Sequence, residues 1–379
     1  MRIVQIVPTL KRGGAERLCV DICQHLTLKG AIVKLVTFHK QNEFNYDLST
    51  FETSQLSASV HLSVSKPNSF CTQSLQQFIA AFKPDIIHSH LFESEIVSRS
   101  LSYPRAKWFT HCHDNMRQFE TLHCNTLFSK KKLTEFYERF YLLNRYRKNG
   151  GNHFIAVSKD TEAYFNRVLP KDLRKVTLLH NGVNISNFTR PQNHNRRRTA
   201  LLELVTTGSL VDNKNQSFLI DVANELKLRG VDVRLHILGG GVNKERLQTK
   251  IEQLNLNNQV SMHGVVNNVA EFLWNADVYV HASLSESFGL VFVEAMAAGL
   301  PVVSLDARGN RDIIQNDING YILAEQSVKE FADKAELLFT NKQKYADMSR
   351  HALETAKQFD IVNYTDKLLN LYQAALEGK

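Results

Sequence analysis

Short apolar runs rich in β-branched residues alternate with helix-length segments along almost the whole chain. In the first half, the strand candidates are residues 2–7, 31–37, 85–90, 107–110, 153–157 and 176–179. In the second half, they are residues 202–207, 233–238, 260–263, 278–281 and 301–305. Strands that are apolar on both faces are typical of parallel sheets covered by helices on both sides. The alternation therefore predicts an α/β fold built on parallel sheets.

A polar, turn-rich and basic stretch, residues 184–198, interrupts this alternation, which then restarts. A chain of 379 residues is also long enough for two domains of ordinary size. We therefore predict two α/β domains of similar architecture, joined by a linker and followed by a terminal helix. The predicted divisions are an N-terminal domain (1–187), a linker (188–200), a C-terminal domain (201–360) and a last helix (361–379).

Residues 283–301 place two glutamates around a predicted junction between a loop and a helix. Seven residues separate Glu286 from Glu294. The apolar run 291–298 predicts a buried helix, and Gly299 shortly before a proline is a typical helix end. Glu286 is therefore expected in the loop before the helix, and Glu294 on its body.

The first turn of a helix offers backbone N–H groups and the positive end of the helix dipole to an anion or a sugar oxygen. Phe288, Gly289 and Leu290 would supply those groups, and Gly289 lets the backbone approach a ligand closely. Taken alone, two glutamates at this spacing also fit an ordinary buried helix with surface carboxylates. The residues around the pair therefore decide the interpretation.

The whole segment resembles the E-x7-E signature of retaining glycosyltransferases of family 4 (glycosyl transferases group 1), in the two glutamates and in the residues around them. This resemblance implies two facing Rossmann-like domains of the GT-B type, with a deep cleft between them. It also implies a C-terminal helix that crosses back to the first domain. The first domain would bind the acceptor, and the second would bind the nucleotide sugar.

The resemblance implies retaining, metal-independent transfer of a hexosyl or N-acetylhexosaminyl group from a nucleotide diphosphate sugar. A UDP-sugar is favoured and a GDP-sugar is the alternative; because the donor is a substrate, no cofactor is expected. The acceptor would be a saccharide or a lipid-linked saccharide in polysaccharide, lipopolysaccharide or other glycoconjugate biosynthesis. A sugar phosphorylase or sugar-nucleotide epimerase on the same architecture stays an alternative, and a non-enzymatic nucleic-acid-binding protein is a more distant one.

Loops after the predicted strands carry the donor-binding residues that the resemblance implies, as expected for open α/β sheets. Within this set Lys214 would stabilise the diphosphate, Glu286 would touch the sugar near its reacting face, and Glu294 would accept hydrogen bonds from the ribose. The full set is Gly13, Gly14, Ser209, Lys214, Gly239, Val265, Val266, Glu286, Phe288, Gly289, Leu290 and Glu294.

One position departs from the family's pattern. In the element that contains Lys214, Ser209 stands where the family has an arginine that helps to neutralise the diphosphate. As a hypothesis, Arg12, Arg308 or Arg311 partly replaces that arginine, because each lies on or near a loop expected at the site.

Histidines follow two predicted strands of the first domain. The resemblance implies that His90 reaches the donor sugar and phosphate and acts in catalysis with Glu286 and Lys214. His88 is the weaker candidate for this role. The H-x-H pair with His111, His113 and Asp114 also has the residue types of a zinc site. We expect no metal, because the resemblance implies metal-independent chemistry and the chain shows no clear D-x-D site.

The acceptor side is the part of the site that the sequence defines least. Arg12, His113 and Asp114 are the weak candidates there. The Gly13-Gly14 pair lacks the third glycine of the G-x-G-x-x-G fingerprint, so an NAD-dependent dehydrogenase is disfavoured.

The chain is basic, with 46 Lys and Arg against 38 Asp and Glu, a formal net charge of +8. Such a balance suits an anionic partner: a nucleotide diphosphate, an anionic lipid surface or a nucleic acid. Residues 128–141 place aromatic and cationic side chains at helical spacing, which is typical of an interfacial helix, and predict peripheral contact with an anionic membrane. No recognisable nucleic-acid motif accompanies the charge, so no nucleic-acid partner is expected.

The predicted location is the cytoplasm, with any peripheral membrane contact at the inner face of the cytoplasmic membrane. The apolar stretch within residues 1–8 is too short for a signal peptide, and no apolar run approaches the ~18 residues of a membrane span. The cysteines are odd in number and fit reduced thiols: Cys19, Cys23, Cys71, Cys112 and Cys124.

Overall fold

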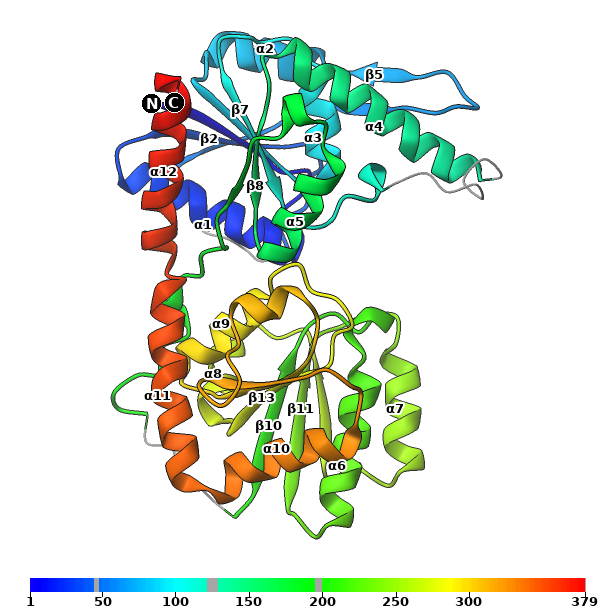
Figure 1. Cartoon of the computed structure of the whole chain (residues 1–379), viewed down its shortest axis with the longest axis vertical. Coiled ribbons are helices and arrows are strands. Elements are labelled where there is room, and N and C mark those ends of the chain that lie inside the picture. Colours follow the sequence, from blue (N-terminus) through cyan, green and yellow to red (C-terminus); the bar gives the residue numbers. More distant parts are fainter. Residues whose placement is uncertain (44–47, 121–128, 195–199, 379) are drawn as a thin grey trace. The chain divides into compact units, whose positions relative to one another are not determined.

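The computed structural model describes residues 1–43, 48–120, 129–194 and 200–378. The chain forms two compact units (Figure 1). Unit 1 comprises Met1–Gly182 and Ile361–Lys379, and unit 2 comprises Val183–Asp360. Part of the predicted linker, residues 195–199, lies outside the described residues.

Unit 1 is built on a parallel sheet with the strand order β3-β2-β1-β6-β7-β8-β9 in the described part of the chain. A small antiparallel hairpin, β4–β5, accompanies it. The bounds are β1 (Arg2–Ile6), β2 (Ile32–Thr37), β3 (Glu52–Gln55), β4 (Ser59–His61), β5 (Ser69–Cys71), β6 (Ile86–His90), β7 (Lys107–Cys112), β8 (His153–Ala156) and β9 (Val176–Leu178).

Helices cover both faces of this sheet, so its central strands are buried on both sides. On β1, Ile3 packs into one apolar cluster, and Val4 and Ile6 pack into another. The helices are α1 (Gly14–Leu28), α2 (Gln73–Phe82), α3 (Leu91–Arg99), α4 (Lys130–Lys148), α5 (Lys159–Val168) and α12 (Ile361–Glu377), with 3-10 turns η1 (Arg117–Phe119) and η3 (Lys171–Leu173).

The last helix, α12, belongs to unit 1, as predicted. It packs beside α1, and both chain ends lie in this unit (Figure 1). Tyr364, Leu368 and Tyr372 of α12 are buried in the cluster that contains Leu18 and Ile22 of α1. The end of the chain therefore completes the core of the domain in which the chain begins.

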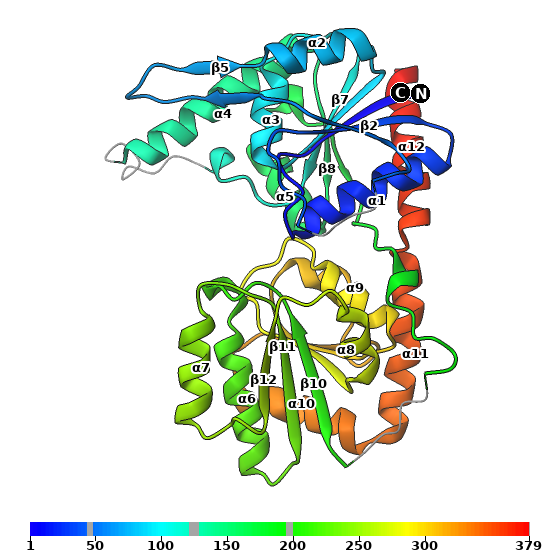
Figure 2. The same ribbon diagram turned by 180° about the vertical axis from the view of Figure 1, so that it is seen from behind.

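Unit 2 repeats the architecture with a parallel sheet of order β12-β11-β10-β13-β14-β15, flanked by helices such as α6 and α7 (Figure 2). Its strands are β10 (Leu202–Thr207), β11 (Val233–Leu238), β12 (Val260–Gly264), β13 (Val278–His281), β14 (Val302–Leu305) and β15 (Gly320–Leu323). Its helices are α6 (Gln216–Leu228), α7 (Lys244–Gln253), α8 (Val269–Asn275), α9 (Leu290–Ala297), α10 (Val328–Thr340) and α11 (Lys342–Gln358), with 3-10 turns η4 (Ile185–Asn187), η5 (Asp212–Lys214) and η6 (Gly309–Asp312).

The two parallel sheets confirm the predicted α/β fold of two Rossmann-like domains. Among the described residues, no helix combines the length and the apolar character that crossing a membrane requires. The four described cysteines are free thiols, and Cys124 lies outside the described residues.

Candidate functional site

Helix α9 begins where the sequence predicts, directly after Gly289. Gly289 has a φ of +93°, and a β-carbon there would lie 2.4 Å from the Phe292 ring, so the turn requires glycine. The body of α9 is almost wholly buried, including Glu294. The first turn of the helix thus starts at a fixed place, beside the loop that carries Glu286.

The backbone of Glu286 is held by the loop that follows β14. Its N–H donates to the carbonyl of Ala307 at 2.9 Å, and its carbonyl accepts from the N–H of Gly309 at 3.1 Å. The side chain, 12% exposed, accepts hydrogen bonds from Lys214 and from Nε2 of His281, the latter at 2.8 Å. Glu286 is therefore an oriented carboxylate with two donors on the same oxygen.

The charge state of Glu286 follows from these contacts. Burial opposes ionisation, but the hydrogen bond from His281 and the positive charge of Lys214 outweigh it and lower the pKa of Glu286 to about 2. Burial also lowers the pKa of His281 from its usual range, although the neighbouring Glu286 opposes this shift. At neutral pH the group consists of a carboxylate, an ammonium group and a neutral imidazole that donates its Nε2–H.

Lys214 reaches Glu286 from the loop after β10. This loop is tied to the segment before α9, because Asn213 donates through Nδ2 to the carbonyl of Ser285 at 2.9 Å and accepts from Ser283 Oγ at 3.1 Å. Glu286 thus contacts a cation and lies four residues before the first residue of α9. This arrangement suits an anion that needs both a charge and backbone donors.

Glycines at the carboxyl ends of three neighbouring strands let their loops pack backbone against backbone. A β-carbon at Gly239 would lie 1.9 Å from the carbonyl oxygen of Gly208. The N–H of Gly239 donates to the carbonyl of Gly264 at 2.7 Å. Val265, which follows, is 58% exposed, and Val266 is half-buried. The edge that carries the predicted donor-binding residues Gly239, Val265 and Val266 is therefore close-packed, with an exposed valine.

The arginines proposed to replace the family's arginine differ in their surroundings. Ser209 itself is exposed. Arg311 forms an ion pair with Asp306, and Arg12, in unit 1, donates through Nε to the carbonyl of Glu43 at 3.1 Å. Arg308 is exposed, and its backbone forms a bridge with that of Glu286. Of the two arginines in unit 2, Arg308 is the one whose backbone pairs with that of Glu286.

In unit 1, the glycine pair lies at the start of α1, as predicted. Gly13 is the N-cap residue, and a β-carbon there would lie 2.1 Å from the carboxylate of Glu16. Burial raises the pKa of Glu16. A carboxylate of the chain itself therefore lies at the helix N-terminus that carries the predicted donor-binding residues Gly13 and Gly14.

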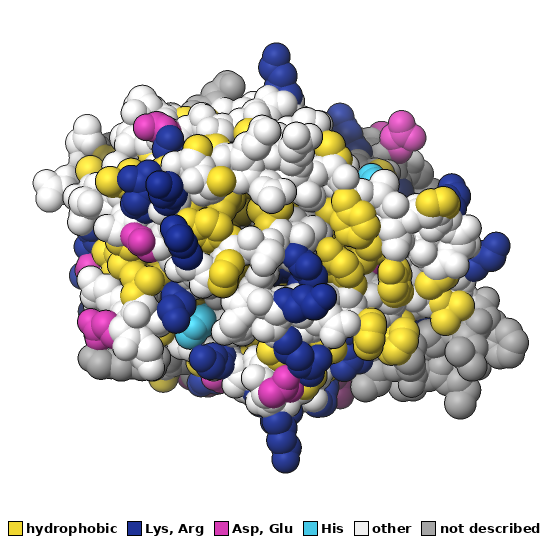
Figure 3. Space-filling model, turned by 90° about the horizontal axis from the view of Figure 1, so that it is seen from above, with side chains coloured by type: hydrophobic (Ala, Val, Ile, Leu, Met, Phe, Trp, Pro, Cys, Tyr) yellow, Lys and Arg dark blue, Asp and Glu magenta, His cyan; other side chains and the backbone are white. Residues whose placement is uncertain are grey.

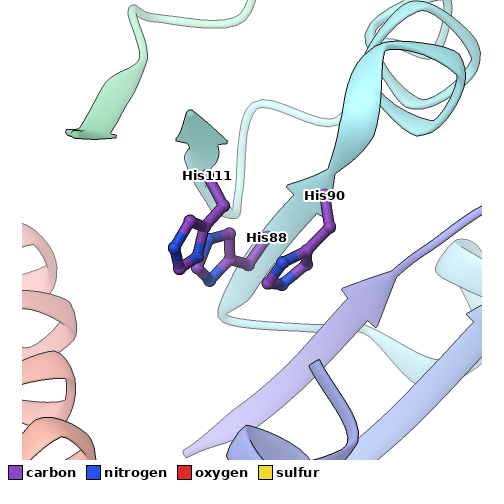
Figure 4. A group of neighbouring side chains, drawn as sticks. All are labelled: His88, His90 and His111. Atoms are coloured by element: carbon purple, nitrogen blue, oxygen red, sulfur yellow. The ribbon is translucent and has the colours of Figure 1, made fainter. Parts of the chain in front are cut away.

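The predicted histidines form one stack at the carboxyl ends of β6 and β7. His88, His90 and His111 lie side by side with their rings stacked (Figure 4). Nδ1 of His90 lies 2.9 Å from Nε2 of His113. The three labelled rings are fully buried, and His113 is more accessible. Asp114 follows His113, and burial raises its pKa.

Within each unit, the structure brings predicted residues together. In unit 2 it joins Lys214 to Glu286 beside the start of α9, and in unit 1 it joins His90 to His113. The sequence analysis did not identify His281 as a partner of Glu286. The sequence does contain a signal for this contact, because His281 ends a predicted strand five residues before Glu286.

Two family models match the chain. The model of glycosyltransferase family 4 matches residues 12–187, and the model of glycosyl transferases group 1 matches residues 190–355. Together the two matches leave only short stretches at the chain ends and between them.

Curated relatives are similar over parts of the chain. The poly(ribitol-phosphate) α-N-acetylglucosaminyltransferase of Staphylococcus aureus is 27% identical over 72% of this chain and 54% of its own length. The 2-deoxystreptamine N-acetyl-D-glucosaminyltransferase of Niallia circulans is 26% identical over 67% of this chain and 68% of its own. The chain spans about half the length, or less, of several other relatives.

Solved structures share the fold over the whole chain. HepE of Anabaena, in complex with UDP and glucose, has a TM-score of 0.76 at 20% identity, covering 99% of this chain and 100% of its own. TarM has a TM-score of 0.75 at 15% identity, covering 98% of each chain. With these folds and the two family matches, the chain belongs to glycosyltransferase family 4, the glycosyl transferases group 1, and has the two Rossmann-like domains of the GT-B type.

Proposed function

We propose that the protein is a retaining glycosyltransferase that moves a hexosyl or N-acetylhexosaminyl group from a UDP-sugar to a saccharide or lipid-linked saccharide. The observation that carries this proposal is the group of Lys214, Glu286 and His281 beside the N-terminus of α9. A solved relative of the same fold holds UDP and glucose, and two curated relatives are named N-acetylglucosaminyltransferases. The comparisons give no support to a sugar phosphorylase, an epimerase or a nucleic-acid-binding protein.

The chemistry follows from where charge develops. Breaking the bond between the sugar and the diphosphate gives an oxocarbenium-like sugar and places negative charge on the leaving group. Lys214, the N-terminus of α9 and Arg308 would stabilise that charge, so the diphosphate would compete with Glu286 for Lys214. Glu286 keeps its second donor, His281, and would face the sugar, while Glu294 would accept from the ribose.

Retention is proposed to occur by attack on the same face of the sugar, with the departing phosphate as the base. Glu286 is therefore given no role as covalent nucleophile. The group described above supplies positive charge from a lysine and from backbone donors, so no metal is assigned to the reaction. In unit 1, His90 is proposed to act in catalysis, as the resemblance implies, and His113 is proposed for the acceptor side.

The experiment that tests this function is a transfer assay with radiolabelled UDP-GlcNAc, UDP-glucose and GDP-mannose and a panel of saccharide and lipid-linked acceptors. The account expects UDP-sugar-dependent product with an α-anomeric linkage by NMR, formed in the presence of EDTA. A β-linked product would contradict retention, and loss of activity in EDTA that Mn²⁺ restores would contradict the metal-independent mechanism. Transfer only from the GDP-sugar would contradict the donor assignment.

Unit 1 also carries a surface suited to a lipid-linked acceptor. On α4, Phe136 and Phe140 are exposed one turn apart, and the predicted interfacial helix is helical from Lys130 onward; Phe128 lies outside the described residues. The β4–β5 hairpin packs beside this helix, because the rings of Phe70 and Tyr141 are 6.1 Å apart.

Cations accompany these apolar side chains. Exposed lysines lie at the start of α4 and in the hairpin: Lys66, Lys130, Lys131 and Lys132. Figure 3 shows Lys and Arg interspersed with hydrophobic side chains on one face of the molecule. Aromatic side chains beside lysines suit the interface of an anionic membrane. We therefore include peripheral contact with such a membrane in the proposed function.

Flotation with phosphatidylglycerol vesicles tests this surface. The double variant Phe136→Ser/Phe140→Ser is expected to lose most vesicle binding, since two apolar anchors are removed. The matched control, Leu228→Ser/Val242→Ser, removes two exposed apolar side chains from unit 2 and should bind like the wild type. Equal binding by the two double variants would contradict the assignment of the surface.

A further inference from the structure

The histidine stack of unit 1 is better suited to hydrogen bonding than to holding a metal. The ring centroids of His111 and His113 are 4.2 Å apart with an interplanar angle of 6°, and those of His88 and His111 are 5.3 Å apart at 7°. Imidazole binds a metal through a lone pair in the ring plane, so parallel rings direct their lone pairs side by side. The hydrogen-bond partners of the ring nitrogens therefore indicate the role of this cluster.

Both ring nitrogens of His90 have protein partners. Nε2 lies 2.8 Å from Oε1 of Gln5 on β1, and Nδ1 lies 2.9 Å from Nε2 of His113. The side chain is fully buried. In this arrangement His90 has no nitrogen left for a substrate and can act on one only through His113.

The hydrogen bonds of Gln5 determine the tautomer of His90. The amide nitrogen of Gln5 donates to Oη of Tyr372 at 3.0 Å, which places the amide oxygen toward His90. An amide oxygen only accepts, so Nε2 of His90 must carry the hydrogen. Burial lowers the pKa of His90 well below its usual range, so the ring is neutral and Nδ1 is an acceptor. His113 must then donate through Nε2, which leaves the lone pair on its Nδ1.

Tyr372 on α12 fixes the orientation of the Gln5 amide. Its hydroxyl accepts from Gln5 and lies 2.5 Å from Nδ1 of His88, a nitrogen that accepts or donates according to the tautomer of its ring. Among the described residues, no other group accepts a hydrogen bond from the amide nitrogen of Gln5, so loss of this hydroxyl removes the contact that fixes the amide. A reversed amide would reverse the tautomers of His90 and His113 in turn.

We propose that Gln5 and Tyr372 are positioning residues of the glycosyl-transfer site, which fix the tautomer of His90 and through it direct the Nδ1 lone pair of His113 to the substrate. This inference rests on the proposed function. In this proposal α12 does more than pack, because Tyr372 determines which ring nitrogen of His90, at the end of β6, carries the hydrogen. His113, the more accessible ring of the pair, is the group that touches the substrate.

Tyr372→Phe tests the proposal, and Tyr364→Phe is its matched control. Both tyrosines are buried on α12, but the hydroxyl of Tyr364 has no hydrogen-bond partner among the described residues. Each variant is labelled with ¹⁵N-histidine, and two-bond ¹H–¹⁵N spectra report which ring nitrogen of His90 and His113 is protonated. The kcat of transfer and the Kd of UDP are measured alongside.

For Tyr372→Phe, we expect mixed tautomers at His90 and His113, and a kcat lowered by about fivefold, the equivalent of one neutral hydrogen bond. The Kd of UDP should stay within about twofold. For Tyr364→Phe, the spectra, kcat and Kd should match the wild type. Should Tyr372→Phe fail to fold, Gln5→Met interrupts the same chain from β1 and must give the same result.

Wild-type tautomers in Tyr372→Phe would overturn the proposal whatever the activity. Mixed tautomers with an unchanged kcat would also overturn it, because the tautomer would then have no part in transfer. If no donor is transferred at all, the proposed function fails, while the spectra still decide whether Tyr372 sets the tautomers.

Discussion

At the scale of the residue, Glu286 shows how a buried carboxylate stays charged. Burial alone would raise its pKa, but His281 and Lys214 both reach the same oxygen, and their combined effect is larger. The Glu286 carboxylate is thus held in its charged form by two protein groups. The same ion pair fixes the position of the Lys214 ammonium group.

The ionisation of Glu286 predicts a pH dependence of stability. Its pKa is lowered in the folded state, so its contribution to the free energy of unfolding is complete above its unfolded value of about 4.5 and is lost as the pH falls toward about 2. The unfolding free energy of the wild type minus that of Glu286→Gln, measured in urea, should therefore be constant above pH 5 and decrease below it.

The control for this measurement is Glu354→Gln, which changes an exposed glutamate on α11. The difference between the wild type and this control is expected to change much less between pH 5 and pH 3. A pH-independent difference for Glu286→Gln would show that the carboxylate is not held in its charged form by these neighbours.

At the scale of the element, α9 is positioned by its first turn. The helix is short and apolar, so packing fixes its body, whereas Gly289 fixes the direction in which the chain enters it. The position of the helix N-terminus relative to the loop bearing Glu286 therefore depends on the conformation of that turn.

Gly289→Ala tests the turn. The new side chain must adopt a φ of +93° and overlap the Phe292 ring, so we expect a loss of about 1–3 kcal/mol in the free energy of unfolding, together with weaker UDP binding. Gly30→Ala is the matched control, because Gly30 has a similar φ of +85° but nothing lies within 4 Å of a β-carbon there. Equal losses of stability in the two variants would show that contact with Phe292 does not matter.

The elements that the sequence analysis missed share a physical reason. The strands β3, β4 and β5 are short, and β3 and β5 are largely exposed, as in Glu52–Gln55, so they lack the apolar runs that predict buried strands. β15, Gly320–Leu323, begins with a glycine and lies at the edge of its sheet. The remaining strands of the two sheets were found, because most of them are buried and burial requires apolar residues.

At the scale of the whole molecule, local patterns predicted the two α/β units and the position of α9. They did not predict the side-chain contacts within each site. Lys214 and Glu286 are 72 residues apart, and His88 and Tyr372 are 284 apart. Residue types at short spacing carry no information about which of these side chains meet. The resemblance named Lys214 and Glu286 separately, whereas their ion pair and the hydrogen bond from His281 appear only once the chain is folded.

The measurement that tests the central claim most directly is the thermal stability of the protein as UDP is added, in the wild type and in Lys214→Ala. A ligand that binds only the folded protein stabilises it by RT ln(1 + [L]/Kd), about 2.7 kcal/mol at a hundredfold excess over Kd. We predict a concentration-dependent rise in Tm with UDP for the wild type and a much smaller rise for Lys214→Ala. Lys227→Ala, which changes a partly exposed lysine of α6, should behave like the wild type. A rise of equal size in Lys214→Ala, or no rise in the wild type, would contradict the assignment of Lys214, Glu286 and the start of α9 as the nucleotide-sugar site.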